Sequence, residues 1–260
     1  MLRITVLIEN DTHGPLTCEH GLSLYVEYRG TVWLLDTGTS GIFVKNADAL
    51  GLDLGQVEGA VLSHGHDDHA GGLPAFFGRN QRAKVYARPA AREEYARDTA
   101  NEATRPAGVD AALFGRFAER FDLDDGPRTL APGLHLIPDG VEHEQSLVAE
   151  TTQGLVVMNS CCHAGADVIV SELLHHFPRQ NVYALVGGFH LVGKHGMGSL
   201  GREPEEVTTL SRRLTGELGV REIHTGHCTG RPAFALMEEA APGRLFHLNT
   251  GDVLLFDETF

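Results

Sequence analysis

The chain has no long apolar run. No window approaches the roughly 18 apolar residues that a membrane-spanning helix needs. Residues 1–10 contain too short an apolar stretch for a signal peptide and no small-residue cleavage site, so they predict a first strand instead. We therefore expect a cytoplasmic protein with no membrane partner.

Basic residues are scarce. The 21 lysines and arginines stand against 35 acidic residues, which gives a formal net charge of −14. Nucleic acids are bound through basic patches, so this balance argues against a nucleic-acid partner. A length of 260 residues, 42% of them hydrophobic, allows a sizeable core. The alternation of predicted strands and helices favours a single domain over 1–260, and a homo-oligomer is left open.

Cysteine is also scarce, with four residues in the chain: Cys18, Cys161, Cys162 and Cys228. The adjacent pair is poorly placed to form a disulfide within itself, so we expect four reduced thiols. Cys162 and Cys228 are each next to a histidine. This leaves two interpretations, a thiolate ligand for a metal or a small packed side chain.

The most informative segment is residues 63–73, SHGHDDHAGGL, where six consecutive residues include three histidines and two aspartates. An apolar run at 57–62 predicts a buried strand before it, and 71–77 predicts the start of a helix after it. Side chains in such a strand-to-helix turn can converge on one point. The alternative interpretation is a polar surface loop with chance histidines.

The spacing within this segment indicates metal binding. His64 and His66 can reach one ion, while Asp68 and His69 point to a second position. Imidazole and carboxylate donors suit Zn²⁺, Mn²⁺ or Fe²⁺. The absence of a thiolate from the segment favours a catalytic over a structural site.

This His-x-His-x-Asp-His turn resembles the signature of the metallo-β-lactamase superfamily, and the resemblance spans nearly the whole chain. It implies an α/β fold, a four-layer αββα sandwich with the metal-binding turns at one edge. It also implies further ligands after later strands, which match His163 within 156–165 and His227 within 223–230. The implied ligands are His64, His66 and His163 for one metal and Asp68, His69 and His227 for the other.

His190 departs from the family pattern. It follows the strand expected at 181–186, at the position where most relatives carry a bridging aspartate. A histidine cannot bridge two cations as a carboxylate does, so we expect one or two divalent metal ions. Zinc is the first choice, with manganese or iron as alternatives.

Several motifs together resemble one subgroup of the superfamily: EHGLS at 19–23, DTG at 36–38, SHGHDDH at 63–69, GGFHL at 187–191 and TGHCTG at 225–230. The subgroup is named for 7,8-dihydropterin-6-methyl-4-(β-D-ribofuranosyl)-aminobenzene-5′-phosphate synthase. The named activity joins a dihydropterin diphosphate to an arylamine ribosyl phosphate and releases diphosphate, on a route to methanopterin-type cofactors. The resemblance therefore implies a small-molecule substrate that carries phosphate. It also implies that Glu19 and His20 line the site and that Asp36 supports the metal turn by hydrogen bonds.

The implied chemistry has two forms. A bound metal lowers the pKa of water and polarises a phosphoryl or carbonyl oxygen, with Asp68 orienting the water or taking its proton. In a synthase-type transfer, the metal would stabilise the departing diphosphate. His190 is expected to donate a proton or to bind the ion. The alternatives are a mononuclear iron dioxygenase and a non-catalytic module that binds a metal or ligand.

Two irregular segments are expected to decide substrate choice. Residues 98–130 are interpreted either as a lid over the site or as a helix, near 111–121, that covers a sheet. Residues 191–203 contain Lys194, Arg202 and four glycines, which suits a phosphate or diphosphate, although a flexible loop is the simpler interpretation.

The pattern along the chain predicts a first sheet and a second sheet with helices between the strands. Strands of the first half are expected near 2–8, 22–29, 31–36, 57–62 and 83–87, with helices near 41–50, from about 71, and near 89–97. Strands of the second sheet are expected near 133–137, 146–151, 154–158, 181–186, 221–224, 245–248 and 252–256, with an amphipathic helix near 204–218. The remaining histidines, including His143, are interpreted as structural or surface residues.

Overall fold

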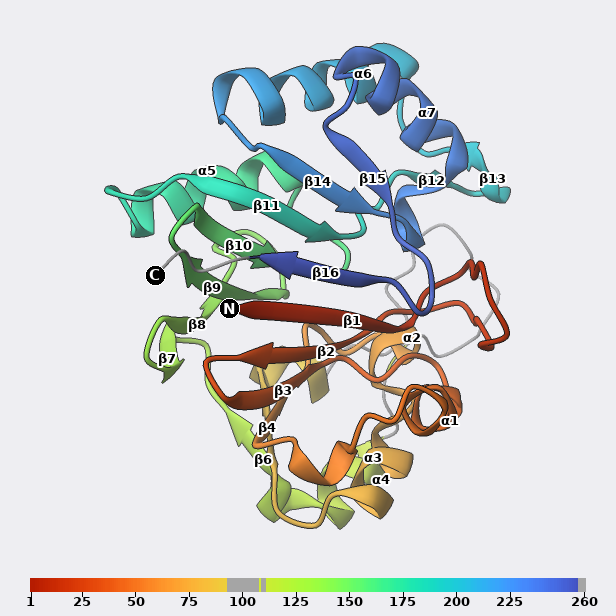
Figure 1. The fold of residues 1–260 in the computed structure, drawn as a ribbon, viewed down its shortest axis with the longest axis vertical. Helices are drawn as coiled ribbons and strands as arrows, with labels where there is room; N and C mark the ends of the chain where they lie inside the picture. Colours follow the sequence, from red (N-terminus) through yellow and green to blue (C-terminus); the bar gives the residue numbers. More distant parts are fainter. Residues whose placement is uncertain (93–107, 109–110, 257–260) are drawn as a thin grey trace. The chain divides into compact units, whose positions relative to one another are not determined.

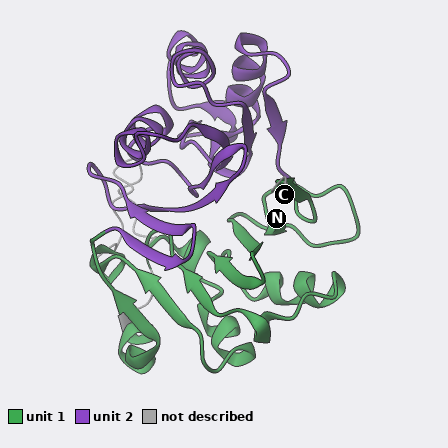
Figure 2. Cartoon of the chain, turned by 60° about the vertical axis from the view of Figure 1, so that its left-hand side comes forward, with its two compact units in different colours: residues 1–126, 249–256 green, residues 127–248, 257–260 purple. Residues whose placement is uncertain are grey.

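The computed structural model describes residues 1–92, 108 and 111–256. The chain divides into two compact units (Figures 1 and 2). Unit 1 comprises residues 1–126 and 249–256, and residues 127–248 belong to unit 2. Each unit contains one large sheet and its own hydrophobic core.

The sheet of unit 1 has the strand order β16-β1-β2-β3-β4-β5-β6. Its strands are β1 (Leu2–Ile8), β2 (Ser23–Tyr28), β3 (Thr31–Leu35), β4 (Gly59–Val61), β5 (Lys84–Ala87), β6 (Phe121–Leu123) and β16 (Val253–Phe256). The pairs that involve β1 and β2 are antiparallel, whereas β3 to β6 run parallel. The carboxyl ends of β3 and β4 therefore lie at the same edge of the sheet.

Helices of unit 1 cover this sheet with aromatic side chains. They are α1 (Ile42–Ala49), α2 (Asp67–Ala70), α3 (Leu73–Arg79) and α4 (Ala111–Arg116). Phe76 and Phe77 of α3 belong to one buried cluster with Phe114 and Phe121. The ring centroids of Phe114 and Phe121 are 4.4 Å apart, so the apolar face expected around 111–121 packs on the core of unit 1.

The sheet of unit 2 has the strand order β15-β14-β11-β10-β9-β8-β7. Its strands are β7 (Arg128–Ala131), β8 (Leu134–Pro138), β9 (Gln145–Thr151), β10 (Gly154–Met158), β11 (Val182–Gly187), β14 (Glu222–Thr225) and β15 (Leu245–His247). Strands β10, β11, β14 and β15 run parallel. A hairpin of β12 (Val192–Gly193) and β13 (Gly196–Leu200) and the helices α5 (Ala166–His176), α6 (Pro204–Arg212) and α7 (Arg231–Ala240) complete the unit.

Most predicted elements lie within a few residues of the observed ones, but the last strand was assigned to the wrong sheet. The segment expected at 252–256 was placed in the second sheet, whereas β16 pairs antiparallel with β1 in unit 1, with Leu2 opposite Phe256 (Figure 1). The physical reason is that β1 pairs with β2 on one side and leaves its other edge for a strand. Leu255 is 59% exposed, as an edge strand allows.

Other boundaries also differ from the predictions. Strands β6 and β7, the β12–β13 hairpin within 191–203, and helices α5 and α7 were not predicted. The helix expected over 204–218 is α-helical only to Arg212 and continues as a π-type turn over Arg213–Glu217. A helix was expected near 89–97. The structure describes residues 89–92 of this segment, and they form a 3₁₀ turn, Pro89–Arg92. Within 98–130, residues 98–107 and 109–110 lie outside the described residues, so the lid remains a hypothesis.

The candidate site residues follow the carboxyl ends of parallel strands in both units. In unit 1, Asp36 follows β3 and the histidine-rich turn follows β4. In unit 2, His163, His190 and His227 follow β10, β11 and β14. In α/β sheets this edge is where ligands bind. No helix in the described ranges has both the length and the apolar character needed to cross a membrane.

Candidate metal centre

One buried carboxylate anchors the histidine-rich turn of unit 1. Oδ1 of Asp36 accepts a hydrogen bond from the backbone N–H of Ser63 at 2.7 Å, and Oδ2 accepts one from the Ser63 hydroxyl at 2.6 Å. Oδ2 also lies 2.9 Å from Nδ1 of His69. Asp36 is buried and has a left-handed backbone, with φ +57°, so the chain accepts local strain to place this carboxylate. The support expected of Asp36 is therefore present.

These hydrogen bonds decide which ring nitrogens face the site. The Asp36 carboxylate accepts a hydrogen bond from the Nδ1–H of His69, which leaves the lone pair of the neutral imidazole on Nε2. The Ser63 hydroxyl donates to Asp36 and accepts from Nδ1 of His64 at 2.9 Å, so the lone pair of His64 is also on Nε2. Both imidazoles thus present the unprotonated nitrogen that a metal requires.

The imidazoles of the turn lie close to one another. Nε2 of His64 is 2.9 Å from Nδ1 of His66, and the ring centroids of His64 and His69 are 4.4 Å apart. Two ring nitrogens at this distance share either a proton or a cation. Nε2 of His69 is 3.5 Å from Oδ2 of Asp68. Three imidazoles and one carboxylate therefore lie close together within one short turn, and these donor types suit a divalent metal ion.

His20 and Glu19 have different surroundings. Nε2 of His20 lies 3.2 Å from Oδ2 of Asp68, and the His20 side chain is 61% exposed, so it lies beside the cluster at the surface. The Glu19 carboxylate instead accepts hydrogen bonds from the N–H and hydroxyl of Ser40, at 3.0 and 2.7 Å. The structure thus places His20 next to a candidate ligand and Glu19 in the support of a neighbouring turn.

The backbone around the turn is closely packed. Both the N–H and the hydroxyl of Thr37 donate to the carbonyl of His69, at 2.7 and 2.9 Å. A Cβ atom on Gly21 would lie 2.4 Å from the carbonyl oxygen of Asp68, and Gly21 has φ +138°, so only glycine fits there. His66 also forms an isolated antiparallel bridge with Gly108. The turn is therefore held from several sides.

In unit 2, a second buried carboxylate supports the turn that carries His163. Glu144 is fully buried, and its two oxygens accept hydrogen bonds from the N–H groups of Cys161, at 2.9 Å, and His163, at 2.6 Å. The side-chain oxygen of Asn159 accepts a hydrogen bond from the N–H of Cys162 at 2.8 Å. Glu144 was not among the residues predicted for the site.

His163 lies between two other histidines. Its ring centroid is 4.8 Å from that of His143 and 4.3 Å from that of His190. His143 was interpreted from the sequence as a structural or surface residue. The pairing of 145–151 with 154–158 as an antiparallel hairpin was the signal that would have placed residues 143 and 144 beside the turn after 158.

His227 and Cys228 form a buried turn after β14. His227 is 1% exposed, with φ +42°. The backbone N–H of His190 donates to Sγ of Cys228 at 3.2 Å. Burial alone would raise the pKa of the Cys228 thiol, but hydrogen bonds with Cys161 and His190 and the His227 imidazole hold it well below its usual value. Burial and the Glu144 carboxylate instead raise the pKa of Cys162 well above the ordinary thiol value.

A cavity of about 720 Å³ in unit 2 lies beside His163 and His190. Its buried lining includes Phe189 and Leu191, and its exposed lining includes Arg202 and Arg213. Nη1 of Arg213 is 2.7 Å from Oδ2 of Asp167, which also lines the cavity. Lys194 is exposed in the β12–β13 hairpin and is not among the lining residues. Of the two predicted phosphate contacts, Arg202 is therefore the one that faces this cavity.

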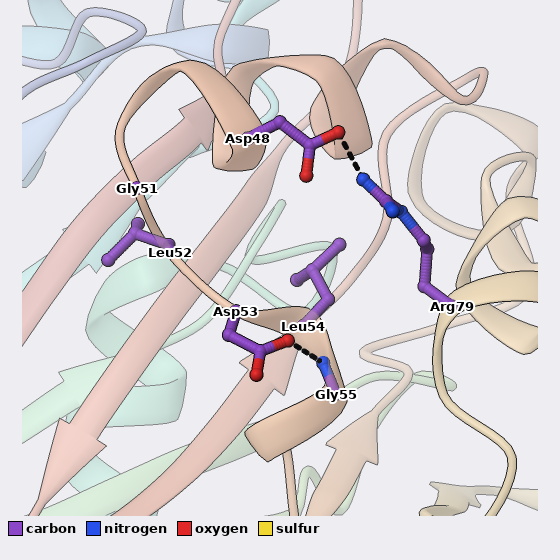
Figure 3. Close-up of a pocket in the computed structure, with 7 residues that line it drawn as sticks. All are labelled: Asp48, Gly51, Leu52, Asp53, Leu54, Gly55 and Arg79. Carbon is purple, nitrogen blue, oxygen red and sulfur yellow. Dashed lines mark hydrogen bonds and ion pairs between the residues drawn. The ribbon is translucent and has the colours of Figure 1, made fainter.

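A smaller hollow of about 260 Å³ lies in unit 1 and contains none of the candidate ligands (Figure 3). It is lined by residues at the ends of α1 and α3, where Asp48 forms an ion pair with Arg79. A hydrogen bond from the N–H of Gly55 lowers the pKa of Asp53, which also lines it. These groups satisfy one another, so the hollow has no evident chemistry of its own.

Comparison with known proteins supports the interpretation of the turn. Residues 16–177 match the family described as the metallo-beta-lactamase superfamily. The 7,8-dihydropterin-6-methyl-4-(beta-D-ribofuranosyl)-aminobenzene-5'-phosphate synthase of Methanocaldococcus jannaschii is 25% identical over 286 residues, covering 94% of this chain and 92% of the relative. A solved metal-dependent hydrolase of the beta-lactamase superfamily is 26% identical, covers 98% of this chain and 99% of its own, and superposes with a TM-score of 0.78.

A diphosphatase from the PhnP family covers 99% of both chains with a TM-score of 0.61, but at 15% identity it shows the fold alone. The family match extends over more than half of the 260 residues, and the expected α/β fold of this type is confirmed. The resemblance to the synthase subgroup is confirmed as well. The chain belongs to the metallo-β-lactamase superfamily.

Proposed function

We propose that the protein is a metal-dependent enzyme that acts on a phosphate-bearing small molecule. The reaction is either hydrolysis or a synthase-type transfer that releases diphosphate. The observation that carries the proposal is the orientation of His64 and His69, whose Nδ1 atoms are engaged by Ser63 and Asp36 so that both Nε2 lone pairs face the turn. The named activities of the synthase relative and of the solved hydrolase support it.

The proposed metal ligands in unit 1 are His64, His66, Asp68 and His69. Their donor set suits zinc, with manganese or iron as alternatives. In unit 2, His163 and His227 are proposed as ligands from the family resemblance. A divalent ion held by these residues would lower the pKa of a bound water and polarise a phosphoryl oxygen.

The other proposed roles belong to side chains near these ligands. Asp68 is proposed to orient the attacking water and to accept its proton on the carboxylate, whose Oδ2 lies 3.2 Å from His20 Nε2. The His190 side chain is exposed and its ring is 4.3 Å from that of His163, so it is proposed to donate a proton to the leaving group. The cavity beside His190 is proposed to hold the substrate, with Arg202 near a phosphate group.

The acidic composition supports a small-molecule substrate over a nucleic acid. With 35 acidic and 21 basic residues, the chain has no excess of the cations that nucleic acids need.

The first test is the metal content per chain, measured by elemental analysis on protein purified without added metal. We expect about one to two equivalents of zinc or manganese in the wild type and a loss of about one equivalent in His64→Ala and in His227→Ala. His135→Ala is the matched control, because His135 is partly buried in β8 and its Nε2 is 3.0 Å from Glu150. Unchanged content in His64→Ala would refute the metal site.

A second test separates the reactions. Dihydropterin diphosphate is supplied with and without an arylamine acceptor, and released diphosphate is measured. Release that needs the acceptor identifies the transferase, whereas release without it identifies the hydrolase. One equivalent of iron with oxygen consumption would replace both with a dioxygenase. Bound metal with no turnover of any phosphorylated compound would indicate a binding module.

A further inference from the structure

Two cysteines lie in the turns that follow parallel strands of unit 2. Cys161 follows β10 and Cys228 follows β14, with β11 between these two strands in the sheet. Because the carboxyl ends of parallel strands meet at one edge, the fold brings the two thiols together. Both Sγ atoms and an imidazole nitrogen of His227 lie within 4.8 Å of one another.

The backbone leaves room for the Cys228 sulfur and directs a donor at it. Cys161, Cys228 and His227 are 3%, 9% and 1% exposed, so the group is shielded from solvent. The N–H of His190 donates to Sγ of Cys228 at 3.2 Å. A Cβ atom on Gly188 would lie 2.5 Å from the same sulfur, so the glycine at this position makes the close approach possible. An N–H donor pointed at a buried sulfur favours a sulfur that carries negative charge.

The donor types suit a metal. Two thiols and one imidazole are a set that zinc binds in proteins. A tetrahedral ion holds such donors about 3.5 Å apart, and the three groups lie within 4.8 Å of one another. His190 lies in the turn that follows β11, between the two cysteine turns, and residues 187–191 contain no acidic side chain. A thiolate from the adjacent turn would supply the missing negative charge.

We propose that Cys161 and Cys228 are thiolate ligands of a divalent metal that His227 also binds. The proposal rests on the proposed function only in that the chain binds metal. On binding, each thiol releases its proton to solvent and gives a sulfur lone pair to the ion. Cys162, although next to Cys161 in the chain, is packed in the hydrophobic core of unit 2 and is not part of the set.

Cobalt substitution tests the assignment. The metal-free protein is loaded with Co²⁺ alone and its near-ultraviolet absorption is recorded, because sulfur-to-cobalt charge transfer gives a band that nitrogen and oxygen ligands do not. We expect the band in the wild type and about half its intensity in Cys161→Ser and in Cys228→Ser. Cys162→Ser, a buried neighbour, and Cys18→Ser, in unit 1, are expected to keep the full band.

Each outcome decides the proposal. A full band in both ligand variants, or a loss confined to Cys162→Ser, would overturn the assignment. Wild-type protein that binds Co²⁺ without the band would overturn it and leave the proposed metal-dependent function standing, whereas failure to bind Co²⁺ would remove both. If a variant does not fold by circular dichroism, zinc-edge X-ray absorption of the wild type decides. A sulfur shell at about 2.3 Å is expected, and a shell of nitrogen and oxygen alone would refute the proposal.

Discussion

Nδ1 of His69 lies 2.9 Å from Oδ2 of Asp36, and neither side chain is exposed to solvent. The same carboxylate also accepts hydrogen bonds from the N–H and the hydroxyl of Ser63. One buried acid thus orients an imidazole and the backbone of the turn that carries it. A partner that fixes a ligand in this way raises metal affinity without touching the metal.

The first prediction follows from this contact. In Asp36→Asn, an amide NH2 replaces one carboxylate oxygen and cannot accept a hydrogen bond from His69 or Ser63. We expect metal affinity to fall by about 10- to 100-fold, as measured by competition with a chromophoric chelator. Asp53→Asn, at an exposed carboxylate of the same unit, is the control and should bind as the wild type does. Equal affinities for both variants would show that Asp36 does not orient the turn.

Glu144 provides a stability prediction. Its fully buried carboxylate accepts hydrogen bonds from the N–H groups of Cys161 and His163. Glu144→Gln sets an amide N–H against one of these donors, so the free energy of unfolding should fall by about 1–3 kcal/mol in urea titrations. Glu142→Gln, two residues away and with an exposed side chain, should change it by less than about 0.5 kcal/mol. A larger effect at Glu142 would contradict this interpretation.

Two glycines should respond in opposite directions to the same substitution. In Gly188→Ala the new Cβ would lie 2.5 Å from Sγ of Cys228 and 2.9 Å from the carbonyl of Ser160, so we expect a loss of about 1–3 kcal/mol. In Gly78→Ala, within α3, the Cβ meets nothing within 4 Å, and helix propensity should raise stability by about 0.5–1 kcal/mol. Thermal unfolding of both variants checks the pair of signs.

The cavity of unit 2 makes a prediction about anion binding. Arg202 lines it, whereas Lys194 of the nearby hairpin does not. Arg202→Ala should weaken inhibition by diphosphate about tenfold, because a charge-assisted contact is lost, and Lys194→Ala should leave it nearly unchanged. The inhibition constants of diphosphate, measured in parallel for both variants, test this prediction. A larger loss in Lys194→Ala than in Arg202→Ala would place the phosphate at the hairpin.

Tyr25 makes stability depend on alkaline pH. Burial, with the Glu27 and Asp53 carboxylates, raises its pKa from 10.0 to about 12. Between these values the folded chain holds a proton that the unfolded chain has lost, so the free energy of unfolding falls as pH rises through the interval. After allowance for solvent screening, the loss is about 1–2 kcal/mol. Denaturant titrations should show a smaller fall in Tyr25→Phe, and equal slopes for both proteins would exclude this cause.

The local parts of the site were predictable because their atoms come from one short segment. The apolar run before Ser63 and the glycines after His69 define a strand-to-helix turn, and β4, α2 and α3 are found there. His163 and His227 could likewise be placed at strand ends, since each follows an apolar run. Spacing and polarity within some ten residues determine such features.

Contacts between distant segments were decided only by the tertiary structure. Strand pairing decides three features. They are the strand at the free edge of β1, the acid that supports the turn of His163, and the thiol near Cys228. An apolar strand would fit beside several others, because backbone hydrogen bonds do not distinguish one partner from another. By itself, therefore, the sequence determined the chemistry of each turn, and packing of the whole chain decided which turns meet within each unit.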